Sequence, residues 1–599
     1  MLRPITILVA LAATLPMTSA ATQTPPTPRR GANVLVSRGS PFPKVETTIA
    51  VNPSRPNVLI GGAIEDTPLN DHVVMYASQD AGGTWTSALL PDLAPEGSGD
   101  PQVAFSPDGI AYASALTIAR RGSADTARRM SVQVFRSVDD GAHWTPAAAY
   151  GAGAFTDHPQ MFVDSVAVRG RLIASALYWA TDQSSDTRLV LFHSLDRGDH
   201  FAPPLPIVAD SEHRLFNVNP LQFSDGSIFV PFVRFRDGPA GACKPFDVDA
   251  VVVDAELTRH SEERAVRHNV PDPNGCGTAL PYAKVTFGID ARRGADRLFV
   301  VLNEPRGDHY EVTFSFSDDR GRTWSPPRSI SAGERDQFRP AIAVDGSGIV
   351  GVSWCEVVSS GPRRSFVQRF GASYDRGASF SPAALVSSAP SPVVASGNDV
   401  AVHSINSPSS RPDGSTELLM TLASSAGDAG EYTGLTTNGR GVFYPFWADS
   451  RTGVSQVWMA SVYTNEAQQR RPAAVVSTAS LRDIAIAFEP AEYDSTAHVF
   501  TIPVRLRNIG TVEECGALSL EVIGSSMGRH PTILNADNRM EWVGARFDFT
   551  HAAGELDCIP RGQVTDVVTI EVRAPAPARP LERPSVPLRV RVIRRGKNE

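Results

Sequence analysis

The sequence predicts an all-β protein: a β-propeller of seven blades, with six as the alternative, followed by a small C-terminal β-sandwich. A turn of the form S-x-D-x-G-x-x-[WF] occurs five times, beginning at Ser78, Ser137, Ser194, Ser317 and Ser373. The first three serines are 59 and 57 residues apart, and the last two are 56 apart. Ser194 and Ser317 are 123 residues apart, a gap that holds two such periods. A repeat of this length that is rich in short strands is typical of propellers.

Each copy of the turn follows a segment of alternating apolar residues, such as VVMYAS, VQVFRS or LVLFHS, so each begins where a strand ends. Within the turn, the Ser and Asp side chains can accept backbone N–H bonds, and Gly supplies a positive φ. The aromatic ring can return to pack on the strand. We therefore interpret all five copies as structural turns.

Seven units can be distinguished between the turns. They begin near Glu46, Asp100, Asp157, Phe216, Lys284, Arg339 and Glu431. Six blades would result if the weak fourth unit or the last one were partial. The last unit has only three clear strands, and the early segment ANVLVSR (32–38) is expected to supply the fourth. That pairing would close the ring and remove an exposed sheet edge.

The S-x-D-x-G-x-x-[WF] turn is the Asp-box, or bacterial neuraminidase repeat, and the chain from about residue 32 to 463 resembles the sialidase superfamily of β-propellers. The resemblance implies that the Asp-boxes lie at the blade periphery, away from the functional site. It does not imply one activity, because Asp-box propellers also include other glycosidases, receptors and binding proteins.

The N-terminus has the pattern of a secretory signal peptide over residues 1–20, followed by a Thr- and Pro-rich leader over 21–31. We therefore expect a secreted or periplasmic protein. No other segment has the length of a transmembrane helix. The 56 basic and 64 acidic residues include no basic run, which argues against a nucleic-acid partner. We expect a glycan or glycoconjugate as partner, a monomer, and no cofactor or metal.

Export would expose the cysteines to oxidising conditions. The economical pairing is two local disulfides, Cys243 with Cys276 and Cys515 with Cys558. Cys355, within the strand GVSWCEV, is expected to be a buried thiol.

The predicted domains are the propeller over residues 32–465, a linker over 466–475 and an accessory β-sandwich over 476–599. The sandwich is predicted from segments such as VFTIPVRLRNIG, ALSLEVIG and VPLRVRVI, in which apolar and polar residues alternate.

The candidate site lies where the first strands of the units begin, because these strands line the channel of a propeller. The residues at these starts form a polar ring of Glu46, Asp100, Asp157, His158, Asn217 or Asn219, Lys284, Arg339 and Tyr432. For each Asp taken alone, the alternative is that Asp before Pro only initiates a turn.

Sialidase chemistry requires arginines to hold a carboxylate, a Tyr nucleophile activated by Glu, and an Asp that protonates the leaving oxygen. The resemblance thus suggests Tyr432 as nucleophile, Asp100 or Asp157 as acid, and Glu46 or Glu356 as base. Arg339, Arg306, His158 and Asn219 are the candidates for binding substrate, with Arg214 as a further arginine. The family's Arg-Ile-Pro motif near the first blade is absent, and Lys44 and Glu46 stand there instead.

Three functions remain open at this point. The first is an exo-acting, sialidase-like glycoside hydrolase that would bring three arginines into one pocket. The second is a glycosidase or lyase for another sugar, using two carboxylates among Glu46, Asp100 and Asp157. The third is a non-catalytic propeller that binds a glycan or protein. The segment WADSRTGVSQVW (447–458) is interpreted as a degenerate Asp-box, with Arg451 paired to Asp449 or to the chain end.

Overall fold

The computed structural model describes residues 25–464 and 484–594, with internal gaps. The longest gaps are 92–96, 121–127, 180–186, 237–244, 273–283 and most of 396–431, with three more near the C-terminus at 526–531, 550–557 and 574–587. All named regular elements of this part are β-strands. It contains no helix with the length and apolar character needed to cross a membrane.

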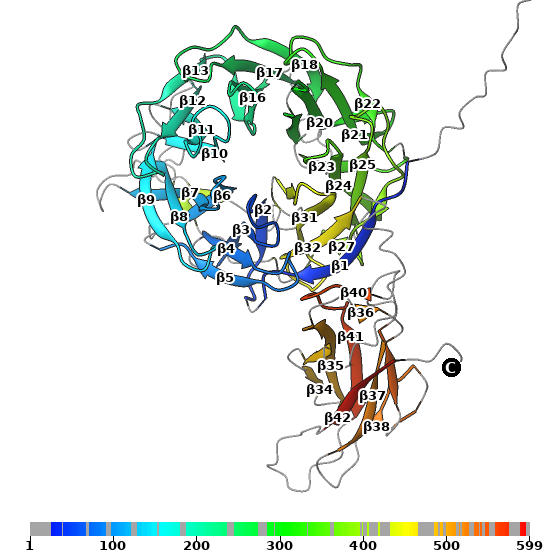
Figure 1. Ribbon diagram of the computed structural model, residues 1–599. Coiled ribbons are helices and arrows are strands. Elements are labelled where there is room, and N and C mark those ends of the chain that lie inside the picture. The colour runs from blue at the N-terminus through cyan, green and yellow to red at the C-terminus, as the bar shows by residue number, and fades with distance from the viewer. Residues whose placement is uncertain are drawn as a thin grey trace, which may run out of the picture.

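Seven antiparallel sheets of four or five strands are formed between Arg29 and Tyr463, and Figure 1 shows them arranged around a central axis. The first sheet contains β2 (Lys44–Val51), β3 (Leu59–Asp66), β4 (Asp71–Ser78) and β5 (Thr86–Leu89). The second contains β6 (Ser98–Phe105), β7 (Ala111–Arg120), β8 (Arg128–Ser137) and β9 (Thr145–Tyr150). The third contains β10 (Phe155–Val163), β11 (Leu172–Trp179), β12 (Thr187–Ser194) and β13 (Leu205–Asp210).

The fourth sheet contains β14 (Arg214–Asn217), β15 (Leu221–Gln222), β16 (Ile228–Phe235), β17 (Pro245–Val253) and β18 (Arg264–Pro271). The fifth contains β19 (Val285–Asp290), β20 (Arg297–Arg306), β21 (His309–Ser317) and β22 (Arg328–Ser329). The sixth contains β23 (Gln337–Val344), β24 (Val350–Ser359), β25 (Ser365–Ser373), β26 (Ala384–Leu385) and β27 (Ser391–Pro392). A short hairpin of β28 (Ser404–Asn406) and β29 (Glu417–Leu419) follows.

The seventh sheet joins the two ends of the ring. It contains β30 (Gly434–Thr437), β31 (Val442–Asp449), β32 (Gln456–Tyr463) and, on its outer edge, β1 (Arg29–Leu35) from the start of the described chain. The predicted closure by the N-terminal segment is confirmed, and β1 begins at Arg29, inside the segment expected to be a leader. Contacts between the first strands run from β2 to β6, β10, β14, then from β15 to β19, β23, β30 and back to β2. The all-β propeller is therefore a closed ring.

Neighbouring sheets are held together by apolar side chains that interdigitate between them. One such core joins the second and third sheets, with Val132 and Val134 on β8 packing against Leu172 and Val190 of the next sheet. These side chains are at most 3% exposed, and each contributes roughly 1.5–3 kcal/mol by its burial. The ring of sheets is thus stabilised by seven interfaces of the same kind as a domain core.

The five Asp-boxes have one geometry. In each, the Ser hydroxyl donates to the Asp Oδ1 at 2.8–2.9 Å and accepts the Gly N–H at 2.7–2.9 Å. The Asp Oδ1 also accepts a backbone N–H four residues on, as from Thr84 at 2.8 Å. The residue before each Gly has a positive φ, as Asp140 does at 63°. The prediction of structural turns is supported by this repeated hydrogen bonding.

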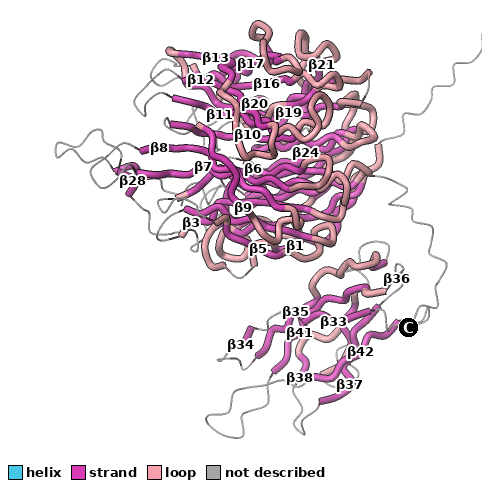
Figure 2. Tube along the Cα trace, turned by 60° about the vertical axis from the view of Figure 1, so that its left-hand side comes forward, coloured by secondary structure: helices cyan, strands magenta, loops and turns pink. Residues whose placement is uncertain are grey.

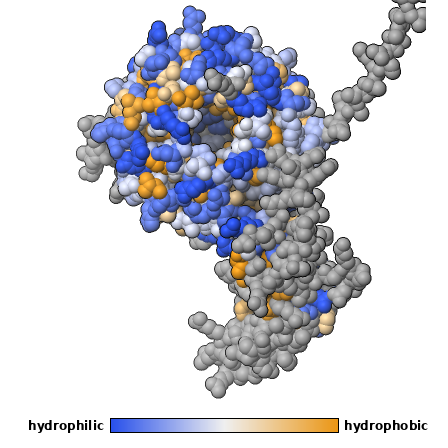
Figure 3. All heavy atoms as spheres, in the orientation of Figure 1, coloured by the Kyte–Doolittle hydropathy of each residue, from blue (hydrophilic) through white to orange (hydrophobic). Residues whose placement is uncertain are grey.

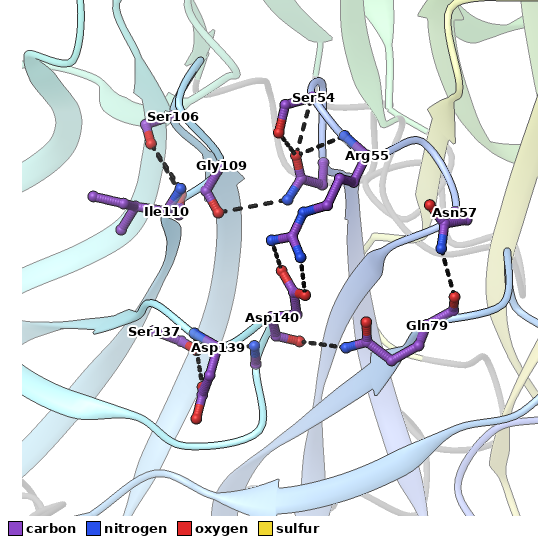
Figure 4. Close-up of polar contacts among 12 residues, drawn as sticks. Ser54, Arg55, Asn57, Gln79, Ser106, Gly109, Ile110, Ser137, Asp139 and Asp140 are labelled. Carbon is purple, nitrogen blue, oxygen red and sulfur yellow. Dashed lines mark hydrogen bonds and ion pairs between the residues drawn. The ribbon is translucent and has the colours of Figure 1, made fainter.

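Asp-boxes also tie adjacent sheets together (Figure 4). The Asp140 side chain, in the second Asp-box, accepts a bidentate ion pair from Arg55 of the first sheet, with one bond at 2.5 Å. The backbone oxygen of Asp140 accepts from the Gln79 side chain at 3.5 Å. The Asp-box end of the propeller is therefore a structural ring.

The C-terminal residues form the predicted β-sandwich, which lies below the propeller near β1 in Figure 1 and is separate from it in Figure 2. One sheet contains β33 (Ile484–Phe488), β34 (Glu492–Asp494), β35 (Val499–Asn508), β38 (Thr532–Ile533) and β41 (Val568–Arg573). The other contains β37 (Leu518–Ser525), β39 (Arg546–Asp548) and β42 (Leu588–Arg594). Buried residues from both sheets, including Leu506, Leu520 and Ile570, form one core. The Gln563 side chain donates to the Asp80 backbone oxygen of the first Asp-box at 3.0 Å.

Of the predicted cysteine pairs, Cys243 and Cys276 lie outside the described residues. The short strands β36 (Glu514–Cys515) and β40 (Cys558–Ile559) place Cys515 directly opposite Cys558, as their predicted disulfide requires. Cys355 is buried, as expected, and its thiol donates to Gln368 Oε1 at 3.4 Å.

Candidate functional site

Four of the seven first strands begin with the same unusual backbone. Each contains a β-bulge at which the pairing register shifts: in β2, β6, β10 and β23. Within these bulges, Glu46, Asp100, His158 and Arg339 have positive φ angles of 56°, 49°, 47° and 49°. Residues other than Gly seldom adopt a positive φ. Bulges next to functional sites change the direction of a side chain. One strained backbone position therefore presents four different functional groups.

Contacts between side chains show that the strand starts of different sheets converge. The His158 ring packs against Phe216 of the fourth sheet, with centroids 3.9 Å apart and the ring planes tilted by 42°. Lys284, directly before β19, places its Nζ 5.3 Å from the Phe216 ring centroid and 5.1 Å from that of Tyr432, which precedes β30. Residues of the third, fourth, fifth and seventh sheets thus meet at one channel mouth. Figure 3 views the ring from the opposite end, which carries the Asp-boxes, and shows a hollow at its centre.

The first three sheets contribute acidic groups to this mouth, which we call the acidic arc: Glu46, Asp100 and Asp157, with His158. His158 Nδ1 lies 3.8 Å from Asp100 Oδ2, and His158 Nε2 lies 3.7 Å from Asp157 Oδ2. One donor atom from each of Asp100, Asp157 and His158 lies within 4.8 Å of the others, a set that could hold a metal ion. These three side chains are only 12–22% exposed.

The fifth and sixth sheets contribute cations, which we call the basic arc: Lys284 and Arg339. Arg339 is 2% exposed, and its guanidinium lies 5.6 Å from the Phe338 ring centroid. On the other side of the ring, Gly430 lies against the acidic arc, because an added Cβ there would lie 2.5 Å from Glu46 Cγ. Tyr432 stands between the arcs, because it contacts Lys284 and follows Gly430 by two residues. The mouth therefore has segregated charge, with the acidic side chains on one side of the opening and the basic side chains on the other.

Other predicted site residues lie elsewhere. Asn219 donates to the Phe287 backbone oxygen at 2.9 Å and accepts the Phe287 N–H at 3.2 Å, so it ties the fourth sheet to the fifth rather than facing a substrate. Glu356 on β24 is paired with Arg369 at 2.8 Å, which makes it a poor base for Tyr432. Arg306 ends β20 with Glu304 4.0 Å away, and Arg214 is exposed at the start of β14. Only Arg339, of the three predicted arginines, is buried in a first strand.

Two groups near the start of the first sheet have altered protonation. Burial lowers the pKa of Lys44, and its ion pair with Glu65 at 2.5 Å opposes that effect. Burial and then the neighbouring Asp66 raise the pKa of Asp71 to about 7. Asp66 and Asp71 are directly paired across the β3–β4 hairpin. Because Lys44 is committed to Glu65, it does not replace the missing arginine of the first blade.

The segment 447–458 is not in the place of an Asp-box. It connects β31 to β32, the second and third strands of its sheet, whereas the Asp-boxes follow third strands. It therefore lies at the mouth end, where Ser455 Oγ donates to the Lys44 backbone oxygen at 2.6 Å. The predicted pairing of Arg451 with Asp449 is confirmed, at 2.9 Å from Nε.

Phe216 and Lys284 were not among the residues selected for catalysis or binding from the sequence. Lys284 was recognised only as a member of the polar ring, and Phe216 only as a strand start. Neither residue precedes Pro, so the one available signal does not mark them: three of the four bulged residues precede Pro, in Asp100-Pro101, His158-Pro159 and Arg339-Pro340. The repeated X-Pro at strand starts marks the positions that the bulges re-aim.

No protein-family model and no curated protein matches the chain. Solved structures similar to it include an α-L-arabinofuranosidase from Fusarium graminearum, at 12% identity and TM-score 0.40, covering 73% of this chain and 99% of that one. A polysaccharide lyase, an ulvan lyase, gives 10% identity and TM-score 0.39 over 73% and 96%. The intramolecular trans-sialidase from Ruminococcus gnavus has 12% sequence identity and a TM-score of 0.34, over 74% of this chain and 99% of that one. At this level of similarity the neighbours do not identify an activity, which must be argued from the residues.

Proposed function

We propose that this chain acts on anionic glycans at the channel mouth, as an exo-acting glycoside hydrolase with sialic acid-type sugars as the first substrates to test. The observation that supports this proposal is the segregated charge of the mouth. A sugar acid needs cations for its carboxylate and a proton donor at its glycosidic oxygen. The basic arc and the acidic arc offer these on separate sides of one opening.

In this proposal, Arg339 and Lys284 hold the carboxylate of the sugar. Tyr432 is the nucleophile, since a neutral phenol does not repel an anionic substrate. The acidic arc donates the proton to the leaving oxygen. One oxygen of Asp100 and one of Asp157 lie within 4.8 Å of each other, so either carboxyl group can reach the same leaving oxygen. Glu46, beside Gly430, is then the base that takes the phenolic proton of Tyr432.

The signal-peptide pattern supports action outside the cytoplasm, where extracellular glycans are found. We propose a secreted or periplasmic location on this basis. The C-terminal sandwich is then an accessory module attached at the Asp-box end, away from the mouth.

A non-catalytic glycan-binding propeller is the second candidate. It is favoured by the burial of Arg339, which is 2% exposed, and by the position of Arg214 and Arg306 outside the buried ring. A site with one buried arginine offers fewer bidentate contacts than a sialidase uses.

The test is hydrolysis of a fluorogenic sialic acid glycoside by the purified protein, beside Arg339→Ala and Tyr432→Phe. A matched control is His143→Gln, at an exposed Asp-box histidine far from the mouth. We expect turnover that falls at least 100-fold in both mouth variants and is unchanged in the control. If the folded protein binds the sugar without turning it over, the second candidate replaces the first. Turnover that persists in both mouth variants would contradict the proposed site.

A further inference from the structure

The acidic arc contains a set of metal-ligating atoms from two neighbouring first strands. Asp100 comes from β6, and Asp157 and His158 come from β10. One carboxylate oxygen from each Asp and one ring nitrogen lie within 4.8 Å of one another. Two carboxylates and one imidazole at the edge of an open channel are a ligand set that divalent transition metals use.

The surrounding structure fixes these donors. The His158 ring packs against the Phe216 ring, with centroids 3.9 Å apart, and the His158 backbone oxygen accepts from the Asn217 side chain at 2.8 Å. The Asp157 carboxylate accepts the His158 N–H at 2.9 Å, which leaves its second oxygen directed to the ring. Bulges with positive φ at Asp100 and His158 set the direction of both side chains. Such outer contacts orient the ligands of metal sites.

The distances at this cluster are longer than those of five other His–Asp pairs among the described residues, which range from 2.6 to 3.3 Å. In the Asp-boxes, His143 and His200 lie 2.6 Å from Asp139 and Asp196, as hydrogen-bonded pairs do. At the mouth, Asp100 Oδ2 stands 3.8 Å from His158 Nδ1 and Asp157 Oδ2 stands 3.7 Å from His158 Nε2, so the two carboxylates face different nitrogens of the ring. Two donors on one ion, each about 2.1 Å from it, are roughly 3.0–3.6 Å apart. Both separations are slightly longer than this range and longer than a hydrogen bond, so an ion would bind one of the two nitrogens and draw the carboxylates toward it.

We propose that Asp100, Asp157 and His158 bind one divalent transition-metal ion, Zn²⁺ or Mn²⁺, at the channel mouth. Three protein ligands leave coordination positions open toward the channel, where a carboxylate or hydroxyl oxygen of a ligand can bind. Metal binding itself does not depend on the proposed hydrolase activity. The role of the ion toward a glycan does rest on that activity, and it would leave Glu46 as the carboxylate for proton transfer.

The test is calorimetric titration of the full-length protein, freed of metal by chelator, with ZnCl₂ and separately with MnCl₂. We expect one ion per chain, and an affinity at least tenfold weaker in Asp157→Asn and in His158→Gln. Asp139→Asn is the control, because it alters a His–Asp pair beside which no third metal-ligating group lies among the described residues, and the metal affinity of this variant should be unchanged. Thermal unfolding of each variant establishes that it is folded.

Binding of Co²⁺ gives a second readout, since a nitrogen ligand changes its visible spectrum, and that change should disappear in His158→Gln. Absence of stoichiometric binding, or binding that all mouth variants retain, would overturn the inference. Stoichiometric binding by a protein that hydrolyses no glycan would refute the proposed function and leave the metal site intact. Hydrolysis that is unaffected by the chelator, with no ion bound, would refute the metal site and leave the proposed function intact.

Discussion

The two ends of the propeller use one repeated backbone in opposite ways. At the Asp-box end, five turns repeat the same Ser, Asp and Gly with hydrogen bonds that agree within 0.2 Å. At the mouth end, four bulges repeat the same positive φ but present Glu46, Asp100, His158 and Arg339. Constant residues on a constant backbone indicate a structural requirement. Different residues held at equal strain indicate selection for what they contact.

The largest expected effect is on stability, and it tests whether some charges at the mouth end serve the fold rather than a ligand. Arg234, at the end of β16, bonds Asp210, Asp249 and Glu263 at 2.7, 2.5 and 3.0 Å. Arg234→Ala should lower the free energy of unfolding by about 3–5 kcal/mol, because it leaves buried carboxylates without their cation. Denaturant unfolding measures this. If the free energy of unfolding fell by less than about 1 kcal/mol, Arg234 would not be a structural charge and would have to be grouped with the charges that serve a ligand.

The next effect compares two glycines with equal φ at opposite ends. Gly377 in the fifth Asp-box has a φ of 88°, and an added Cβ would lie 2.5 Å from Phe314. Gly453, at the mouth end, has a φ of 90° with no atom within 4 Å of such a Cβ. Gly377→Ala should cost about 2–4 kcal/mol and Gly453→Ala about 1 kcal/mol, since only the first adds a clash to the backbone strain. Equal losses in urea unfolding would refute this account of the Asp-box end.

A smaller effect tests the strain at the mouth. Glu46→Gly relieves the positive φ of 56° but increases the entropy of the unfolded chain. The two terms oppose each other, so the free energy of unfolding should stay within about 1 kcal/mol of the wild type, while activity at the mouth falls. A loss above about 2 kcal/mol would show that Glu46 is held for stability rather than for a ligand.

The smallest effect concerns protonation within the Asp-boxes. The hydrogen bond from His200 lowers the pKa of Asp196, and the same bond raises the pKa of His200. The raised pKa of His200 means that its contribution is fully present below its unfolded value of about 6.5 and is lost as pH rises through the folded value. Proton NMR titration should give His200 a midpoint above about 6.5. The variant His200→Thr has the residue that two other Asp-boxes carry at the same position, Thr84 and Thr323. In this variant the pH dependence of stability should disappear.

Much of the fold was predictable because its information is local. Each Asp-box contains its own hydrogen-bonding partners, so five copies revealed the turn, the repeat and the strand before it. Closure by the N-terminal strand was also predictable, because the last unit lacked one strand. The segment 447–458 was wrongly placed, since the turns after second and third strands use the same Asp and Gly residues.

The site was only partly predictable, because its geometry comes from contacts between sheets. The sequence identified the strand starts, including Glu46, Asp100, Asp157 and Arg339. It could not show that Asn219 is used between the fourth and fifth sheets, or that Phe216 would meet both His158 and Lys284. These contacts depend on how far each bulge turns its side chain, which no single segment encodes.

The most direct test of this account is binding of the wild type to an array of acidic and neutral glycans, beside Arg339→Gln at the mouth and Val138→Ser at the Asp-box end. Val138 is 78% exposed, so its replacement should not disturb the fold. We predict signals on acidic glycans that disappear in Arg339→Gln and persist in Val138→Ser. Signals on neutral glycans alone, or signals on acidic glycans lost only in Val138→Ser, would contradict a functional mouth with segregated charge.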